Sequence, residues 1–167
     1  MLRRFEPKDA EALAVVYRDA VRTVGPVAYT KEQVESWAKY PEDIEEFRAR
    51  LSRGVTLIAE EGGSVVAFGQ LEPDDHLAFL YCSGRFCRKG IGAEIYRALE
   101  AHALQKGIPA ISTDASRISR PFFAKHGYSV VEVEHVVRSG IEFERFRMLK
   151  KTEANQSLQP TALLGRG

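Results

Sequence analysis

The residues best suited to chemistry lie in one short segment, which reads Arg85-Phe86-Cys87-Arg88-Lys89-Gly90-Ile91-Gly92-Ala93. Two glycines two positions apart allow the backbone to approach a ligand without an intervening Cβ atom. An amphipathic helix is expected to begin there, so its free N–H groups and the positive end of its dipole would face the loop. Arg85, Arg88 and Lys89 add positive charge. The segment therefore predicts a site for a phosphate or pyrophosphate.

Three known phosphate-binding loops can be compared with this segment. The P-loop pattern G-x-x-x-x-G-K-[ST] is absent, and the dinucleotide pattern G-x-G-x-x-G would need a glycine where Ile95 stands. The pattern that fits is [QR]-x-x-G-x-[GA], with Cys87 first, Gly90 fourth and Gly92 sixth. In this respect the segment resembles the acyl-CoA loop of the GNAT superfamily of N-acetyltransferases. The alternative is an ordinary helix start with basic surface residues.

Other segments resemble the same family in the same order along residues 1–150. Residues 79–82 look like the strand whose backbone pairs with pantetheine, residues 119–128 like the late helix and following strand, and residues 140–150 like the last strand. The resemblance implies that acetyl-CoA is the co-substrate and that its acetyl group moves to an amine by direct attack on the thioester. The implied acetyl-CoA-binding residues are Leu80, Tyr81, Cys82, Cys87, Arg88, Lys89, Gly90, Ile91, Gly92 and Ala93.

Two positions depart from the family pattern. Cys87 replaces the usual Gln or Arg. The family binds phosphate through backbone amides of this loop, so binding can survive the replacement. Phe123 stands where many members carry a Tyr that protonates the departing thiolate. A thiol has a pKa of about 8.5, so its anion is a tolerable leaving group near neutral pH. The hydroxyl of Tyr81 or of Tyr128 could replace the missing acid, or either residue could simply pack in the sheet.

The general base has two candidates, His76 and Asp114. Freeing a lysine-like amine near pH 7.5 costs about 4 kcal/mol, so acetylation of such an amine needs a base. His76 begins the strand that leads to Leu80 and Cys82, and alternation along a strand predicts that all three share one face. Asp114 ends the next strand. The competing interpretations are a solvent-exposed histidine at a loop end and an aspartate that caps a turn.

An aromatic group upstream is expected to form the acceptor site. Tyr29, Trp37 and Tyr40 lie in the region that shapes the acceptor pocket in the family. Core packing of the same rings is the competing interpretation. The sequence does not identify the amine.

Hydrophobic periodicity predicts the elements that position these residues. Strands are expected at residues 2–6, 55–60, 64–71, 76–82, 108–113, 128–137 and 141–149. Helices are expected from Pro7 to 24, after Thr30, and at 41–51, 90–106 and 119–126. Thr30 and Gln33 are spaced as a capping box, and Gly62-Gly63 is typical of a hairpin turn. The order predicts an α/β fold with a mixed, mostly antiparallel central sheet flanked by helices.

Composition limits the remaining possibilities. The length of 167 residues favours a single domain. The net charge of +1 argues against nucleic acid or an anionic membrane as a partner. The two cysteines, Cys82 and Cys87, are expected to be reduced thiols in a cytoplasmic protein, and no metal site is predicted. Residues 1–150 are expected to form the domain and 151–167 a disordered tail. A homodimer and a non-catalytic acyl-CoA-binding module both stay open.

Overall fold

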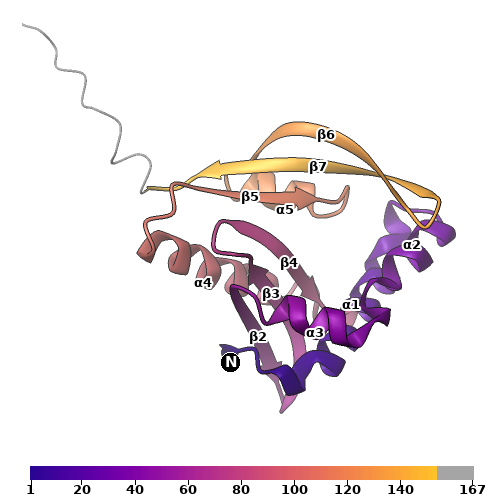
Figure 1. Cartoon of the computed structure of the whole chain (residues 1–167), viewed down its shortest axis with the longest axis horizontal. Coiled ribbons are helices and arrows are strands. Elements are labelled where there is room, and N and C mark those ends of the chain that lie inside the picture. The colour runs from indigo at the N-terminus through magenta and orange to yellow at the C-terminus, as the bar shows by residue number, and fades with distance from the viewer. Residues whose placement is uncertain (154–167) are drawn as a thin grey trace, which may run out of the picture.

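A computed structural model describes residues 1–153, which fold as an α/β domain (Figure 1). Within these residues seven strands form one sheet, in the order β1-β2-β3-β4-β5-β7-β6, and the β4–β5 pair alone is parallel. The strands are β1 (Leu2–Arg4), β2 (Val55–Glu61), β3 (Ser64–Leu71), β4 (His76–Cys82), β5 (Ala110–Ala115), β6 (Ser129–Arg138) and β7 (Ile141–Lys151). The α-helices are α1 (Ala10–Val24), α2 (Lys31–Ala38), α3 (Ile44–Leu51), α4 (Ile91–Gln105) and α5 (Arg120–Lys125). The predicted fold class and element order are confirmed.

Local sequence signals set several element ends as predicted. The Thr30 hydroxyl accepts a hydrogen bond from the Gln33 backbone N–H at 3.2 Å, and the Gln33 side chain accepts one from the Thr30 N–H at 2.9 Å. This reciprocal pair starts α2. The tight turn at Gly62-Gly63 joins β2 to β3, with φ of 58° and 80° at the two glycines.

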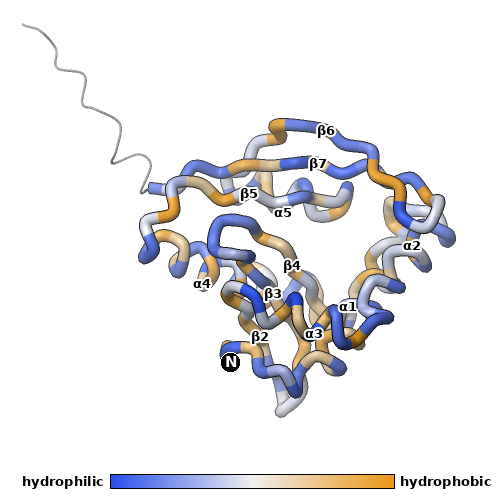
Figure 2. The backbone as a smooth tube through the Cα atoms, in the orientation of Figure 1, coloured by the Kyte–Doolittle hydropathy of each residue, from blue (hydrophilic) through white to orange (hydrophobic). Residues whose placement is uncertain are grey.

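The sheet separates two hydrophobic clusters. One cluster packs α4 and α5 against β2, β3, β4, β5 and β7, and includes the buried Ile95, Leu99 and Met148. The other packs α1, α2 and α3 against the opposite face of β2, β3 and β4, and includes the buried Tyr17 and Phe68. Figure 2 shows hydrophobic residues along β2, β3 and β4 and hydrophilic residues in the loop before β4. The two clusters hold the central strands rigidly between helices.

The sheet opens where β4 meets β5. The register pairs His76 with Ser112 and Leu77 with Thr113, and within residues 1–153 the two strands do not pair beyond that point. Figure 1 shows β5, β7 and β6 swung away from β2, β3 and β4. Strand edges that face each other without pairing leave backbone N–H and C=O groups available to a ligand.

A β-bulge in β4 corrects one prediction. The register with β3 pairs Phe79 with Gln70 but Leu77 with Leu71, so Ala78 is an extra residue. Leu77 packs on the α4 side of the sheet, while the adjacent Ala78 and Phe79 both pack on the α1 side. The expectation that His76 shares a row with Leu80 and Cys82 was therefore wrong, because the bulge reverses the alternation between them.

The domain extends slightly past its predicted end. β7 continues to Lys151, which pairs with Ala110. Thr152 is buried, its N–H donates to the Pro109 carbonyl at 3.0 Å, and its hydroxyl donates to the Ile108 carbonyl. The predicted tail at 151–167 therefore begins too early by at least two residues, and its part from 154 onward lies outside the described residues. Within residues 1–153 no helix is long and apolar enough to cross a membrane.

Candidate active site

A cavity of about 460 Å³ lies at the opening between β4 and β5. Its wall combines residues of α1, α2, β4, β5, β7 and the loop before α4 with residues of α5. The candidate residues that line it are Tyr29, Trp37, Tyr40, His76, Leu80, Tyr81, Cys82, Cys87, Gly92, Asp114 and Phe123. Residues predicted separately from motifs more than 80 positions apart thus meet at one site.

The loop before α4 gives the cavity a backbone-lined end. Arg88 and Gly90 both have left-handed φ values, 61° and 83°, and Gly90 is the N-cap residue of α4. A Cβ atom built on Gly90 or Gly92 would meet no protein atom within 4 Å. The backbone at the start of this 15-residue helix is therefore open to a ligand, and its unpaired N–H groups favour an anion.

The loop residues differ in what they offer that ligand. Ile91 is buried in the cluster around α4, so its side chain packs inward and only its backbone can contribute. The side chains of Arg88 and Lys89 do not line the cavity and lie at its loop end, where Lys89 sits over the Phe86 ring at 5.4 Å. Asp19 of α1 was not anticipated from the sequence; its carboxylate accepts a hydrogen bond from the Gly84 N–H at 2.7 Å and links the start of this loop to α1.

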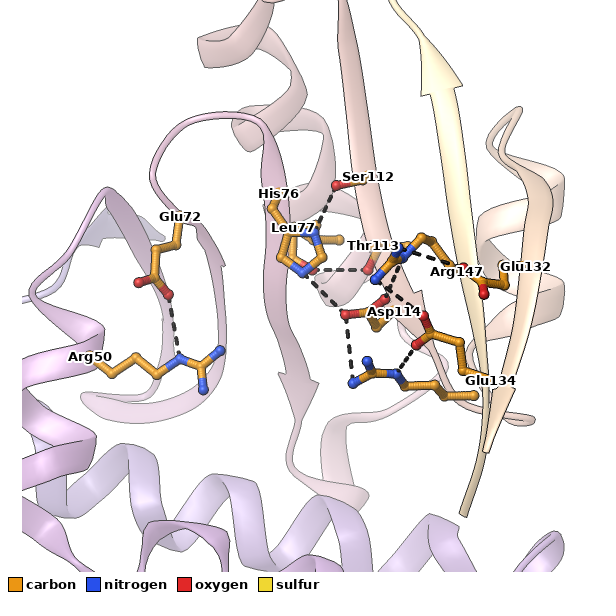
Figure 3. Close-up of polar contacts among 11 residues, drawn as sticks. Arg50, Glu72, His76, Leu77, Ser112, Thr113, Asp114, Glu132, Glu134 and Arg147 are labelled. Atoms are coloured by element: carbon orange, nitrogen blue, oxygen red, sulfur yellow. Dashed lines mark hydrogen bonds and ion pairs between the residues drawn. The ribbon is translucent and has the colours of Figure 1, made fainter. Parts of the chain in front are cut away.

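The two base candidates lie next to each other. The Nδ1 atom of His76 is 2.8 Å from the Ser112 hydroxyl, and its Nε2 atom is 3.7 Å from an Asp114 carboxylate oxygen (Figure 3). The distance of 3.7 Å between Nε2 and Asp114 is too long for a hydrogen bond, so Asp114 does not occupy Nε2. Two further hydrogen bonds join this end of β4 to β5 and do not involve the imidazole. The Ser112 N–H donates to the Asp75 carbonyl, and the Thr113 hydroxyl donates to the Leu77 carbonyl.

Asp114 also faces two arginines of β7. Arg147 Nε lies 3.8 Å and Arg145 Nη1 lies 3.9 Å from the carboxylate, and β6 supplies Glu134, which accepts from Arg145 at 2.6 Å. That hydrogen bond lowers the pKa of Glu134. Figure 3 shows Asp114 between His76 and this arginine–glutamate group. The pairing follows from the register, since Asp114 stands opposite Arg147.

The tyrosines proposed as acids have different positions. Tyr81 lines the cavity and stacks against Phe68 at 5.8 Å, and burial raises the pKa of its phenol. Tyr128 is buried beside Phe123 and is not among the residues that line the cavity. Burial raises the pKa of Tyr128 to about 12. Phe123 itself reaches the cavity wall, where it offers no proton.

Tyr29 and Trp37 face each other in the wall, with ring centroids 5.5 Å apart. The Tyr29 hydroxyl is occupied, because it accepts a hydrogen bond from the Arg117 N–H at 2.9 Å. Tyr29 is therefore both a packed residue and a wall residue, so the two interpretations of this group are compatible. The ring of Phe143 in β7 extends the wall, 6.2 Å from Tyr29, and was not anticipated from the sequence.

Among residues 1–153, no group of three or more His, Cys, Asp or Glu side chains is placed so that it could hold a metal ion. Cys82 and Cys87 are free thiols within residues 1–153, and burial together with the neighbouring Cys87 raises the pKa of Cys82 to about 11. Cys82 is therefore protonated at neutral pH.

A family model described as the acetyltransferase (GNAT) domain matches residues 27–150, which contain β4, the loop, α4 and the whole C-terminal part of the site. The chain belongs to the GNAT acetyltransferase family. It is accordingly an acyl-CoA-dependent acetyltransferase.

Known GNAT proteins resemble the chain over nearly its full length. The GCN5-related N-acetyltransferase of Rhodopseudomonas palustris, described as an aminotransferase, class-II, is 32% identical, with a TM-score of 0.88 over 91% of this chain and 95% of that one. The uncharacterized N-acetyltransferase YafP of Escherichia coli K12 is 23% identical over 153 residues, 91% of this chain and 96% of YafP. The PaiA N-acetyltransferase of Thermoplasma acidophilum, solved with coenzyme A, shares the fold with 22% identity and a TM-score of 0.73 over 91% of this chain and 98% of that one.

Proposed function

We propose that this GNAT protein transfers an acetyl group from acetyl-CoA to the amine of a small molecule or peptide by direct attack of the amine on the thioester. The observation that carries the proposal is a single cavity lined both by Cys87 and Gly92 at the start of α4 and by His76 and Asp114 at the β4–β5 junction. A candidate anion site and a candidate base thus border the same cavity.

The proposed placement of acetyl-CoA follows the backbone. Its pyrophosphate would bind the free N–H groups at Gly90–Ala93, beside Arg88 and Lys89. Its pantetheine arm would pair with the β4 edge at Leu80–Cys82, which lacks a β5 partner beyond Leu77 in the described chain. The PaiA structure with coenzyme A supports this class of ligand for the fold.

His76 is the proposed general base, acting directly or through one water. Donation of its Nδ1 proton to the Ser112 hydroxyl would leave the Nε2 lone pair for the amine proton. Asp114, 3.7 Å from Nε2, would stabilise the imidazolium that forms. The two residues that were alternative bases at the sequence level would then act as one unit.

Tyr81 is the proposed hydrogen-bond donor to the departing sulfur. Because burial raises the pKa of Tyr81, its hydroxyl keeps its proton at neutral pH and can donate. Full proton transfer is not required, since a thiolate with a pKa of about 8.5 leaves readily near neutrality. Phe123 in the usual acid position is therefore compatible with catalysis.

An acetyl-CoA consumption screen over amino acids, polyamines, aminoglycosides and peptide N-termini tests the function. We expect free CoA to appear at a rate that rises with the concentration of at least one amine, with the acetylated amine detected by mass spectrometry. Tight binding of acetyl-CoA without amine-dependent release of CoA from any of them would instead establish a non-catalytic acyl-CoA-binding module, which the absent acid at Phe123 favours as the second candidate.

A further inference from the structure

The charged side chains that line the cavity are unequal in sign. Three arginines contribute to the wall, Arg50, Arg138 and Arg145, against two carboxylates, Asp114 and Glu144. Setting aside the imidazole of His76, the wall carries an excess of positive charge. Since a cavity with low-dielectric walls concentrates the field of its charges, this excess favours a ligand with a negative group.

Arg138 is the source of the excess. Arg50 is engaged by Glu72 at 3.4 Å and Arg145 by Glu134 at 2.6 Å. Among residues 1–153, Arg138 has no carboxylate within ion-pair distance, whereas Arg50 and Arg145 each have at least one. Arg138 is exposed and is one of the residues that line the cavity, so its guanidinium is available to an oxyanion of a bound molecule.

The two carboxylates of the wall are already engaged. Asp114 faces Arg145, Arg147 and His76 within 4 Å, as the distances of 3.9, 3.8 and 3.7 Å show. Glu144 accepts from Arg117 at 3.3 Å. A polyamine or aminoglycoside would bring a second cation into a space whose carboxylates have partners and whose unengaged charge is positive, so such acceptors are disfavoured.

The backbone of Arg138 is held in place over the cavity. Arg138 ends β6 at the tip of the β6–β7 hairpin, which lies beside α2 in Figure 1. The Ser36 hydroxyl of α2 donates to the Arg138 carbonyl at 3.4 Å, and the Gln33 side chain donates to the Glu142 carbonyl at 3.0 Å. These contacts link the hairpin tip, and with it Arg138, to α2.

Arg138 also lies near the aromatic wall of the cavity, which is formed by Tyr17, Trp37 and Tyr81. Burial raises the pKa of Tyr17 and of Tyr81, and the positive charge of Arg138 acts in the opposite direction on both phenols. The rings of Tyr17 and Tyr81 are 4.5 Å apart, and Trp37 lies 6.4 Å from Tyr81. An apolar surface thus adjoins the cationic group, which would accommodate a short carbon chain that ends in an oxyanion.

We propose that the acceptor is a small amine that also carries a carboxylate or another oxyanion, and that Arg138 binds this oxyanion while the aromatic wall holds the carbon chain. The proposal rests on the proposed acetyltransferase function and names its substrate class. Arg138 would be a specificity residue that touches the acceptor and not acetyl-CoA.

The test compares matched acceptors on matched variants. The acceptors are ω-amino acids of two to six carbons and α-amino acids, each against its amide, the corresponding alkylamine and, for the ω-series, the diamine. The proteins are the wild type, Arg138→Gln, Arg138→Lys and the control Arg53→Gln, which removes an exposed arginine outside the cavity. The readouts are kcat/KM for each acceptor and the affinity for acetyl-CoA.

We expect the wild type to prefer the acid over its neutral partner, and Arg138→Gln to lower kcat/KM for the acid by about 10- to 100-fold while sparing the neutral amine. Arg138→Lys should keep much of the preference for the acid. Arg53→Gln should use every acceptor as the wild type does. The affinity for acetyl-CoA should be unchanged in all the variants. Equal use of acid and amide by the wild type, or an unaltered preference in Arg138→Gln, would overturn the substrate class while leaving the acetyltransferase function intact. Absence of CoA release with every amine would overturn the function itself, and this inference with it.

Discussion

Replacing His76 by Ala isolates the proposed base from the rest of the site. The β4–β5 junction should survive, because the Ser112 N–H still donates to the Asp75 carbonyl at 2.9 Å and the Thr113 hydroxyl to the Leu77 carbonyl at 2.9 Å. The imidazole is partly exposed and packs in neither hydrophobic cluster, so its removal leaves the core unchanged. Loss of activity in a folded His76→Ala protein can then be attributed to chemistry.

The size of the effect follows from the amine. A lysine-like amine at pH 7.5 must lose a proton at a cost of about 4 kcal/mol, and a positioned base typically contributes about 10²- to 10⁴-fold to the rate. We therefore expect His76→Ala to lower kcat/KM by about 100-fold or more at pH 7 for an accepted amine. The defect should shrink as pH rises, because more of the amine is then already neutral.

The assay is a pH–rate profile of CoA release for the wild type, His76→Ala and Ser112→Ala. Ser112 is a positioning residue, so its loss should cost about 5-fold, the value of one ordinary hydrogen bond. Acetyl-CoA affinity should stay within about twofold in all three proteins, since none of these side chains is placed on the cofactor. Profiles of the wild type and His76→Ala that coincide in shape and height would refute His76 as the base, and Asp114→Asn would then be the variant to examine.

Three further predictions concern the loop, the domain end and one partly buried ion pair. Gly92→Ala should raise the melting temperature by about 1–4 °C through better helix propensity and keep acetyl-CoA binding, because the loop pattern accepts alanine at this position and no protein atom lies within 4 Å of the added methyl group; calorimetry showing lost affinity would contradict the match of this segment to the pattern. Truncation after Lys150 should lower the melting temperature by about 3–6 °C, through loss of the hydrogen bonds of Thr152, whereas truncation after Glu153 should not; equal melting temperatures would place the domain end at Lys150. Asp9→Asn should destabilise the protein by about 1–3 kcal/mol at pH 7, because Arg3 donates two hydrogen bonds to this buried carboxylate at 2.9 and 2.8 Å. Those bonds lower the pKa of Asp9 below its ordinary 3.8, so the stabilisation is present above pH 3.8 and is lost as pH falls through the lowered value; a difference in unfolding free energy that grows as pH falls below 3.8 would contradict it.

Much of the fold was predictable because its signals are local. The capping box of Thr30 and Gln33 and the glycine turn at Gly62-Gly63 depend on neighbours within three residues, and both form as expected. The loop before α4 was predictable for the same reason, since a left-handed Gly90 and an unobstructed Gly92 follow from the lack of a side chain.

The parts that escaped prediction depend on pairing between distant segments. The bulge at Ala78 is fixed by the register with β3, and it alone decides on which face His76 lies. Arg138 and Phe143 reach the cavity because the β6–β7 hairpin bends back to α2, about 100 positions earlier in the chain. Thr152 carries no periodic signal, and its burial depends on the carbonyls of Ile108 and Pro109.

The central claim is that acetyl-CoA binds at the start of α4, and calorimetry on two matched glycine variants tests it most directly. Gly90 and Gly63 have similar left-handed φ values, 83° and 80°, and neither has a protein atom within 4 Å of a built Cβ. Glutamate at either position imposes the same backbone strain, but Gly63 lies in the β2–β3 turn, away from the cavity. We expect Gly63→Glu to bind acetyl-CoA like the wild type and Gly90→Glu, equally stable, to show no measurable binding. Wild-type affinity in a folded Gly90→Glu protein would contradict the account.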